Sequence, residues 1–162
     1  TVATNLAATA TGFGERVVLV EGDLRRPCLA ARFGLEEAPG LAQVLLEGVP
    51  LERALRPTEI PNLLLLPAGR AVTNPGELIA SSRMRDLTAE LQRHADLVVF
   101  DAPSVLAHAE TASLASTLDA ALLVARAGKV SRRDLSRGRE RLGETGARVL
   151  GVVLNAARGS PV

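Results

Sequence analysis

The sequence predicts one α/β domain with a mostly parallel sheet and helices on both of its faces. Five short apolar runs have the continuous Val and Leu character of strands that are buried on both sides, at residues 16–21, 63–66, 97–101, 120–125 and 148–154. Segments with apolar residues at helical spacing separate these runs, and strands that alternate with helices favour parallel pairing. Phenylalanine is the only aromatic residue, and the aliphatic core that remains suits a layered α/β fold.

The segment between the first two strands, residues 34–62, combines Gly, Pro and Glu with short apolar clusters, which predicts small helices and turns at the sheet edge. After the second strand, residues 75–92 are predicted to form one helix. Asn74 stands at the N-cap position of this helix, Pro75 at its first position and Glu77 at its third. A helix start of this kind needs no ligand to explain it.

Residues 131–145 are predicted to form a further helix, which Ser131 opens. One face of this helix is basic and carries Arg132, Arg133, Arg137, Arg139 and Arg141. A solvated surface is the simpler interpretation of these charges, and contact with an acidic partner or a lipid headgroup is the alternative.

The bulk properties of the chain exclude several classes of protein. A length of 162 residues fits one domain, and no low-complexity linker or internal repeat divides it. A net charge of +1 gives no long-range field for nucleic acid, and no stretch is apolar and long enough to span a bilayer. The single cysteine, Cys28, cannot form an internal disulfide, which favours a cytoplasmic location. His94 and His108 have no second ligand at metal-binding spacing, so structural or surface roles are expected.

Acidic side chains follow two of the predicted strands. Glu21 and Asp23 come at the end of the first strand, and Asp101 ends the third. Because ligands of parallel sheets bind beyond the carboxyl ends of the strands, the fold brings these carboxylates to one edge. Such a cluster repels itself unless a cation is present, and Mg²⁺ held by carboxylates and phosphate oxygens is the usual solution. Capping and pairing with Arg25 and Arg26 is the alternative interpretation.

Three motifs make the chain resemble a known family. They are Gly22-Asp23-Leu24-Arg25-Arg26-Pro27, Asn74-Pro75-Gly76-Glu77-Leu78 and Gly151-Val152-Val153-Leu154-Asn155. Together they resemble the bacterial protein-tyrosine kinases that control exopolysaccharide synthesis and export. The resemblance runs to the end of the chain and implies the three-layer P-loop NTPase fold of MinD- and ParA-like proteins.

The resemblance also implies roles for individual residues, with ATP and Mg²⁺ as cofactors. The segment that ends at Asp23 is similar to the family's Walker A′ motif, whose two acids serve Mg²⁺ and help to deprotonate the attacking tyrosine. Glu21 stands where the family has the first aspartate, and Asp101 resembles the Walker B aspartate. Arg25 and Asn155 resemble nucleotide-site residues, with Asn155 as the contact to the base.

The position of Thr1 implies that part of the family's machinery lies outside this sequence. Thr1 would follow the Walker A serine or threonine, so we expect the phosphate-binding loop, its lysine and the strand before it to precede residue 1. Residues 1–162 are therefore expected to be a kinase domain truncated at its N-terminus. The chain has no tyrosine, and the acceptor tyrosines and the self-association helix of the family are expected outside it.

The favoured function is an ATP-dependent tyrosine autokinase that regulates capsular polysaccharide polymerisation and export, with a membrane activator protein as partner. The domain would then work in the cytoplasm, at the inner face of the membrane. A MinD- or ParA-like ATPase switch is one alternative. Departures from the family pattern at Glu21, Ser104 and Glu110 keep a second alternative open, a degenerate scaffold without chemistry.

Overall fold

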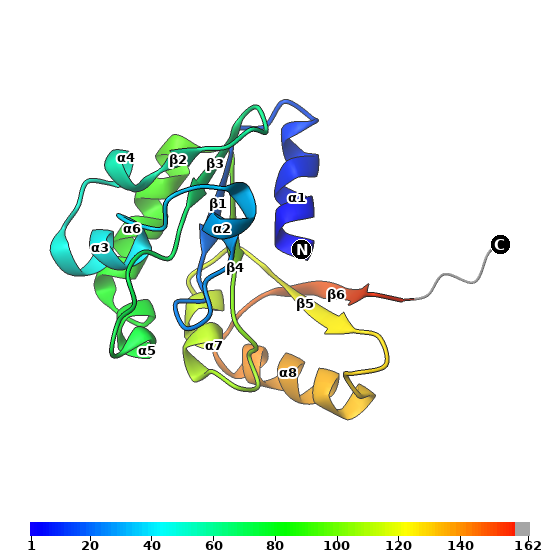
Figure 1. Ribbon diagram of the computed structural model, residues 1–162. Helices are drawn as coiled ribbons and strands as arrows, with labels where there is room; N and C mark the ends of the chain where they lie inside the picture. The colour runs from blue at the N-terminus through cyan, green and yellow to red at the C-terminus, as the bar shows by residue number, and fades with distance from the viewer. Residues whose placement is uncertain (158–162) are drawn as a thin grey trace. The chain divides into compact units, whose positions relative to one another are not determined.

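The computed structural model describes residues 1–157 of the chain. Within this range the chain divides into two compact units, Ala3–Pro103 and a second one that begins at Ser104. Figure 1 follows the elements in chain order, from α1 at the blue end to β6 at the red end. No helix of residues 1–157 is long and apolar enough to cross a membrane.

The first unit is built on a four-stranded sheet with the order β2-β3-β1-β4. The central strand, β1 (Val17–Glu21), pairs in parallel with β3 (Leu63–Leu66) and with β4 (Leu97–Asp101). The edge strand β2 (Arg56–Pro57) pairs with β3 in the antiparallel direction. All five residues of β1 are buried, as expected for a strand with neighbours on both sides and helices on both faces.

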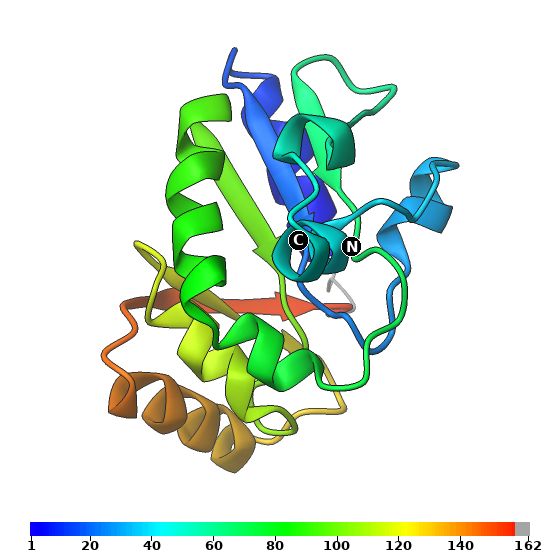
Figure 2. The ribbon, with the colours of Figure 1, turned by 90° about the vertical axis from the view of Figure 1, so that its left-hand side faces the viewer.

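Helices cover both faces of this sheet, and Figure 2 shows the second face. α1 (Val2–Thr11) lies on one side of the strands and α6 (Ser82–His94) on the other. The connections contain four shorter helices, α2 (Leu29–Phe33), α3 (Leu41–Glu47), α4 (Leu51–Ala54) and α5 (Pro75–Ile79).

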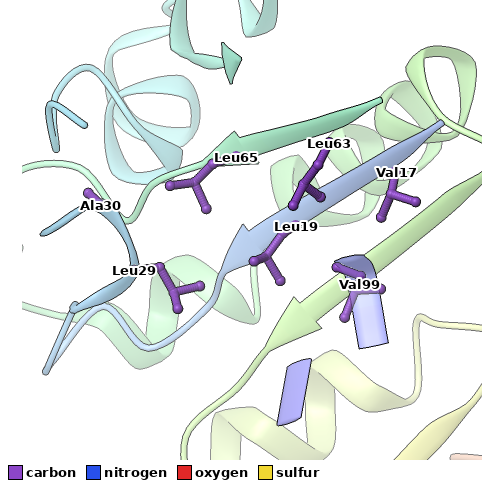
Figure 3. Packing of buried hydrophobic residues seen from close by; sticks show 8 residues of the cluster. Val17, Leu19, Leu29, Ala30, Leu63, Leu65 and Val99 are labelled. Atoms are coloured by element: carbon purple, nitrogen blue, oxygen red, sulfur yellow. The ribbon is translucent and has the colours of Figure 1, made fainter. Parts of the chain in front are cut away.

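The core on the α1 side holds the strand ends in place. Figure 3 shows Leu19 of β1, Leu63 of β3 and Val99 of β4 gathered beside Leu29 of α2, and Ala7 of α1 belongs to the same cluster. Each fully buried leucine stabilises the fold by roughly 1.5–3 kcal/mol. This cluster therefore fixes the relative position of the two strands that carry Glu21 and Asp101 at their ends.

The second unit contains a parallel pair of strands, β5 (Ala121–Arg126) and β6 (Val149–Asn155), with the helices α7 (Ala109–Ala115) and α8 (Arg132–Glu144). Ala112 and Leu142 of the helices are buried, with Leu123 and Val149 packed against them. The alternate side chains of the two strands are at least two-fifths exposed, at Leu122, Val124, Leu150, Val152 and Leu154.

The predicted α/β class with a mostly parallel sheet is confirmed, and all five predicted strands form within one residue of their expected bounds. The expectation that every strand is buried on both faces is wrong for β5 and β6. Their burial alternates along the strand, because helices of the second unit cover only one of their faces. Residues 34–62 form short helices, as predicted, and also the edge strand β2, which was not predicted.

The single helix predicted over residues 75–92 is two helices, α5 and α6. Ser81 interrupts it: its hydroxyl donates to the Leu78 carbonyl at 2.7 Å and accepts from the Met84 amide at 3.3 Å. The hydroxyl thus caps a new helix start in place of continuing the old one. Asn74 is the N-cap residue of α5, as predicted, but its side chain makes no cap hydrogen bond.

The helix predicted over residues 131–145 is confirmed as α8. Ser131 and Asp134 form a capping box, in which the Asp134 amide donates to the Ser131 hydroxyl at 3.1 Å. Four of the five arginines on this helix are exposed. The fifth, Arg141, is half-buried and donates to the Leu106 carbonyl at 3.0 Å.

Candidate functional site

The carboxyl ends of β1 and β4 bring three acidic residues together. Glu21 and Asp101 are register partners on the two parallel strands, and Asp23 follows β1 by two residues. Gly22 lies between the acids, and its amide donates to the Asp101 carbonyl at 2.8 Å. A Cβ at residue 22 would lie 3.1 Å from that oxygen, so glycine permits this close approach of the two strand ends.

Glu21 is almost completely buried, with 2% of its surface exposed. One carboxylate oxygen, Oε1, accepts hydrogen bonds from the backbone amides of Cys28 and Leu29. The other, Oε2, accepts from the Ala68 amide at 3.2 Å. A buried charge is tolerated when hydrogen bonds satisfy it, and here the donors belong to the start of α2 and to the segment after β3. Glu21 therefore ties these two segments to the end of β1.

Asp23 is half-buried and organises the turn that follows β1. Its Oδ1 accepts from the Arg25 amide at 3.1 Å and from the Arg26 amide at 3.0 Å. An aspartate that bonds the backbone two and three residues ahead fixes a tight turn. The turn holds the Asp23 carboxylate at the same strand edge as Asp101.

Burial raises the pKa of Asp101, and the negative charges of Glu21 and Asp23 raise it further. The Arg32 guanidinium acts in the opposite direction. The raised pKa shows that the ionised form of Asp101 is disfavoured by its surroundings. A cation at this edge would relieve the repulsion, and carboxylates are the oxygen ligands that Mg²⁺ prefers, so the donor chemistry of Asp23 and Asp101 fits this ion. The carboxylate oxygens of Glu21, Asp23 and Asp101 do not all lie within 4.8 Å of one another in the described structure.

The cofactor-binding residues expected from the sequence lie at three places. Thr1 is the N-cap residue of α1, and its hydroxyl lies 3.4 Å from Nη1 of Arg32. Arg25 is exposed on the turn that Asp23 organises. Asn155 ends β6 in the second unit, where its side-chain oxygen accepts from the Ala156 amide at 2.8 Å. The first two accompany the strand-end acids within the first unit, and Asn155 does not belong to that unit.

Two features of the site were not predicted from the sequence. The first is Arg32, for which no role was predicted. The Ala68 amide is a backbone group 47 residues away from Glu21, and no side-chain pattern marks it. Only the folded arrangement of β1 and β3 brings it to the carboxylate.

Comparison with known sequences gives a consistent group of relatives, although no protein-family model matches the chain. It is 33% identical over 158 residues to the tyrosine-protein kinase YwqD of Bacillus subtilis, covering 98% of this chain and 67% of that protein. It is 30% identical over 156 residues to the tyrosine-protein kinase CpsD of Streptococcus pneumoniae serotype 4, covering 96% of this chain and 69% of that protein. The tyrosine-protein kinase wzc of Salmonella typhi is longer, and the chain spans 22% of its length at 31% identity.

Solved structures of the same kind resemble the fold. The kinase domain of the Escherichia coli tyrosine kinase ETK superimposes with a TM-score of 0.90 at 27% identity, covering 99% of this chain and 65% of that one. The septum site-determining protein MinD of Pyrococcus horikoshii, solved with Mg-ADP, gives a TM-score of 0.77 at 24% identity. The match covers 94% of this chain and 63% of that one. The second likeness concerns the fold alone. Together they confirm the predicted MinD-like P-loop fold class.

Proposed function

The chain belongs to the bacterial protein-tyrosine kinases, and we propose that it transfers the γ-phosphoryl group of ATP to tyrosine with Mg²⁺ held by Asp23 and Asp101. The observation that carries this proposal is the shared strand edge. Asp101 lies there in register with Glu21, and its pKa is raised first by burial and then by the negative charges of Glu21 and Asp23. Mg²⁺, when bound, neutralises charge on the phosphate oxygens during transfer.

Each acid at the edge has a different task in this proposal. Asp101 is a ligand of the metal, because its surroundings disfavour the ionised carboxylate when no cation is bound. Asp23, half-buried on a turn fixed by its own hydrogen bonds, also faces the metal and accepts the proton of the attacking tyrosine hydroxyl. Glu21 contributes indirectly, since both its oxygens accept from backbone amides and thereby position α2 and the segment after β3.

The phosphate groups of ATP require hydrogen-bond donors as well as a metal ion. We propose that a phosphate-binding loop upstream of Thr1 supplies backbone amides and a lysine, with Thr1 at the start of the helix behind it. The chain spans about two thirds of the shorter relatives and about a fifth of the longer ones, so each relative contains sequence that residues 1–162 do not match. Arg25 and Asn155 are proposed as further nucleotide contacts, Asn155 to the base.

The cellular role follows from the family. We propose that the domain regulates capsular or exopolysaccharide polymerisation and export from the cytoplasm, at the inner face of the membrane. A membrane activator protein would be its partner, and self-association would use a segment outside residues 1–162. The exposed arginines of α8 are available for an acidic surface of such a partner.

Phosphotyrosine formation by the full-length protein with Mg·ATP, followed by mass spectrometry, tests the proposed activity. The expected result is ATP-dependent phosphorylation of tyrosines outside residues 1–162, since this segment contains none. ATP hydrolysis without phosphotyrosine would favour a MinD-like switch instead. Absence of nucleotide binding by the full-length protein would favour a degenerate scaffold.

A further inference from the structure

A second group of metal-ligating side chains lies away from the strand-end acids. Glu52 of α4 meets Glu90 and His94 of α6, and one ligand atom from each of the three lies within 4.8 Å of the other two. Nε2 of His94 is 3.5 Å from Oε1 of Glu52. Among residues 1–157 this is the one group of three or more such side chains with converging ligand atoms.

The positions on the two helices explain why the three side chains converge. Glu90 and His94 are four residues apart on α6, so they project from one face of that helix. Glu52 approaches from the short helix α4, 38 residues earlier than Glu90 in the chain. His94 is the last residue of α6, where the helix dipole is negative and favours a cation.

The basic residue that shares a surface hollow with His94 is already paired. Arg16 and His94 line the same shallow hollow of the first unit. The Arg16 guanidinium is engaged by the Asp96 carboxylate at 2.7 and 3.0 Å, so its charge is balanced there. Two carboxylates and one imidazole therefore face each other without a counter-charge from Arg16.

We propose that Glu52, Glu90 and His94 form a binding site for a borderline divalent cation of the Zn²⁺ class. Ligand atoms around one tetrahedral zinc are separated by roughly 3.4 Å, given bond lengths of about 2.1 Å, and the His94 to Glu52 distance already matches this separation. The remaining approach needs only side-chain rotation, because Glu52 is 65% exposed. An imidazole with two carboxylates favours zinc-like ions over Mg²⁺, which prefers oxygen ligands alone.

Occupancy of this site has a structural consequence. Three protein ligands from two helices leave one tetrahedral position for water, so the ion would join α4 to the end of α6. A simple ion pair between protonated His94 and Glu52 could hold the same two residues without a metal. The two arrangements differ in whether a metal binds and in whether Glu90 is needed.

Calorimetric titration of the protein with Zn²⁺, in an excess of Mg²⁺ that occupies carboxylate-only sites, tests the proposal. One equivalent should bind, and His94→Gln, Glu90→Gln and Glu52→Gln should each weaken the affinity on the order of tenfold or more. His108→Gln is the matched control, because His108 lies near one carboxylate, Glu110, at 3.8 Å. That variant should bind Zn²⁺ like the parent protein.

Three results would overturn the proposal. The first is an unchanged Zn²⁺ affinity in His94→Gln, and the second is an equal loss of affinity in His94→Gln and His108→Gln. The third is a loss confined to the two α6 variants, with Glu52→Gln binding normally, which would reduce the site to two ligands on one helix. Thermal unfolding without metal should be similar for all variants, and it identifies any that fail to fold.

Discussion

Glu21 and Asp101 lie opposite each other at the ends of two adjacent parallel strands, yet their carboxylates have different surroundings. Glu21 is buried, and its oxygens accept from the amides of Cys28, Leu29 and Ala68. Asp101 has a raised pKa because burial and the neighbouring acids disfavour its charge. One acid is satisfied by the backbone and the other is suited to a cation.

Replacing Glu21 with alanine should destabilise the protein by about 2–4 kcal/mol, because it leaves several buried amides without their acceptor. Glu21→Gln keeps the shape and one acceptor oxygen, so its cost should be smaller. Chemical denaturation measures both, with the exposed Glu36→Ala as control. A Glu21→Ala protein as stable as the control would contradict the positioning role of this carboxylate.

Asp101→Asn should make the protein more stable at neutral pH. The pKa of Asp101 is raised by burial, and next by Glu21 and Asp23, so stability is lost as pH rises from its ordinary value of 3.8 through the raised one. Asparagine has no proton to lose, and below about pH 3.8 Asp101 is itself protonated in both the folded and the unfolded state, so the gain should disappear there. Denaturation curves across this range provide the check, and a variant that is less stable at neutral pH would show that the ionised Asp101 is well satisfied.

Much of the first unit could be predicted from local pattern. Continuous Val and Leu runs identified β1, β3 and β4, and the acids at their ends identified the candidate site. The direction of the Glu21 oxygens could not be predicted, because it depends on the Ala68 amide, which only the fold brings close. The sequence pattern predicts which side chains reach the edge, whereas long-range packing decides what each of them contacts.

The errors have the same origin. The runs of β5 and β6 look like those of β1, but the burial of a strand depends on what covers its second face, and composition does not encode that. The break between α5 and α6 falls at Ala80 and Ser81, without the Gly or Pro that usually marks one. Apolar spacing continues across the break, so a single helix was predicted.

Two cap residues offer a matched test of helix capping. Ser131→Ala should cost about 1 kcal/mol, because it removes the hydroxyl that accepts from the Asp134 amide at 3.1 Å. Asn74→Ala should cost roughly 0.5 kcal/mol or less, because the Asn74 side chain makes no cap bond and only approaches Glu77 at 3.4 Å. Thermal unfolding of the two variants shows which substitution costs more stability. A larger cost at Asn74 would mean that its side chain has a role beyond the helix start.

The central claim is that Asp23 and Asp101 bind the same metal ion. The most direct test is to measure the rate of phosphotyrosine formation as a function of Mg²⁺ concentration. The full-length protein should be compared with its Asp23→Asn and Asp101→Asn variants, and with Asp86→Asn on the exposed surface of α6 as control. We expect both strand-edge variants to remain folded and to lose phosphotransfer by on the order of a hundredfold or more, while the control keeps the parent rate. Parent rates in both variants, with the same dependence on Mg²⁺, would contradict the account.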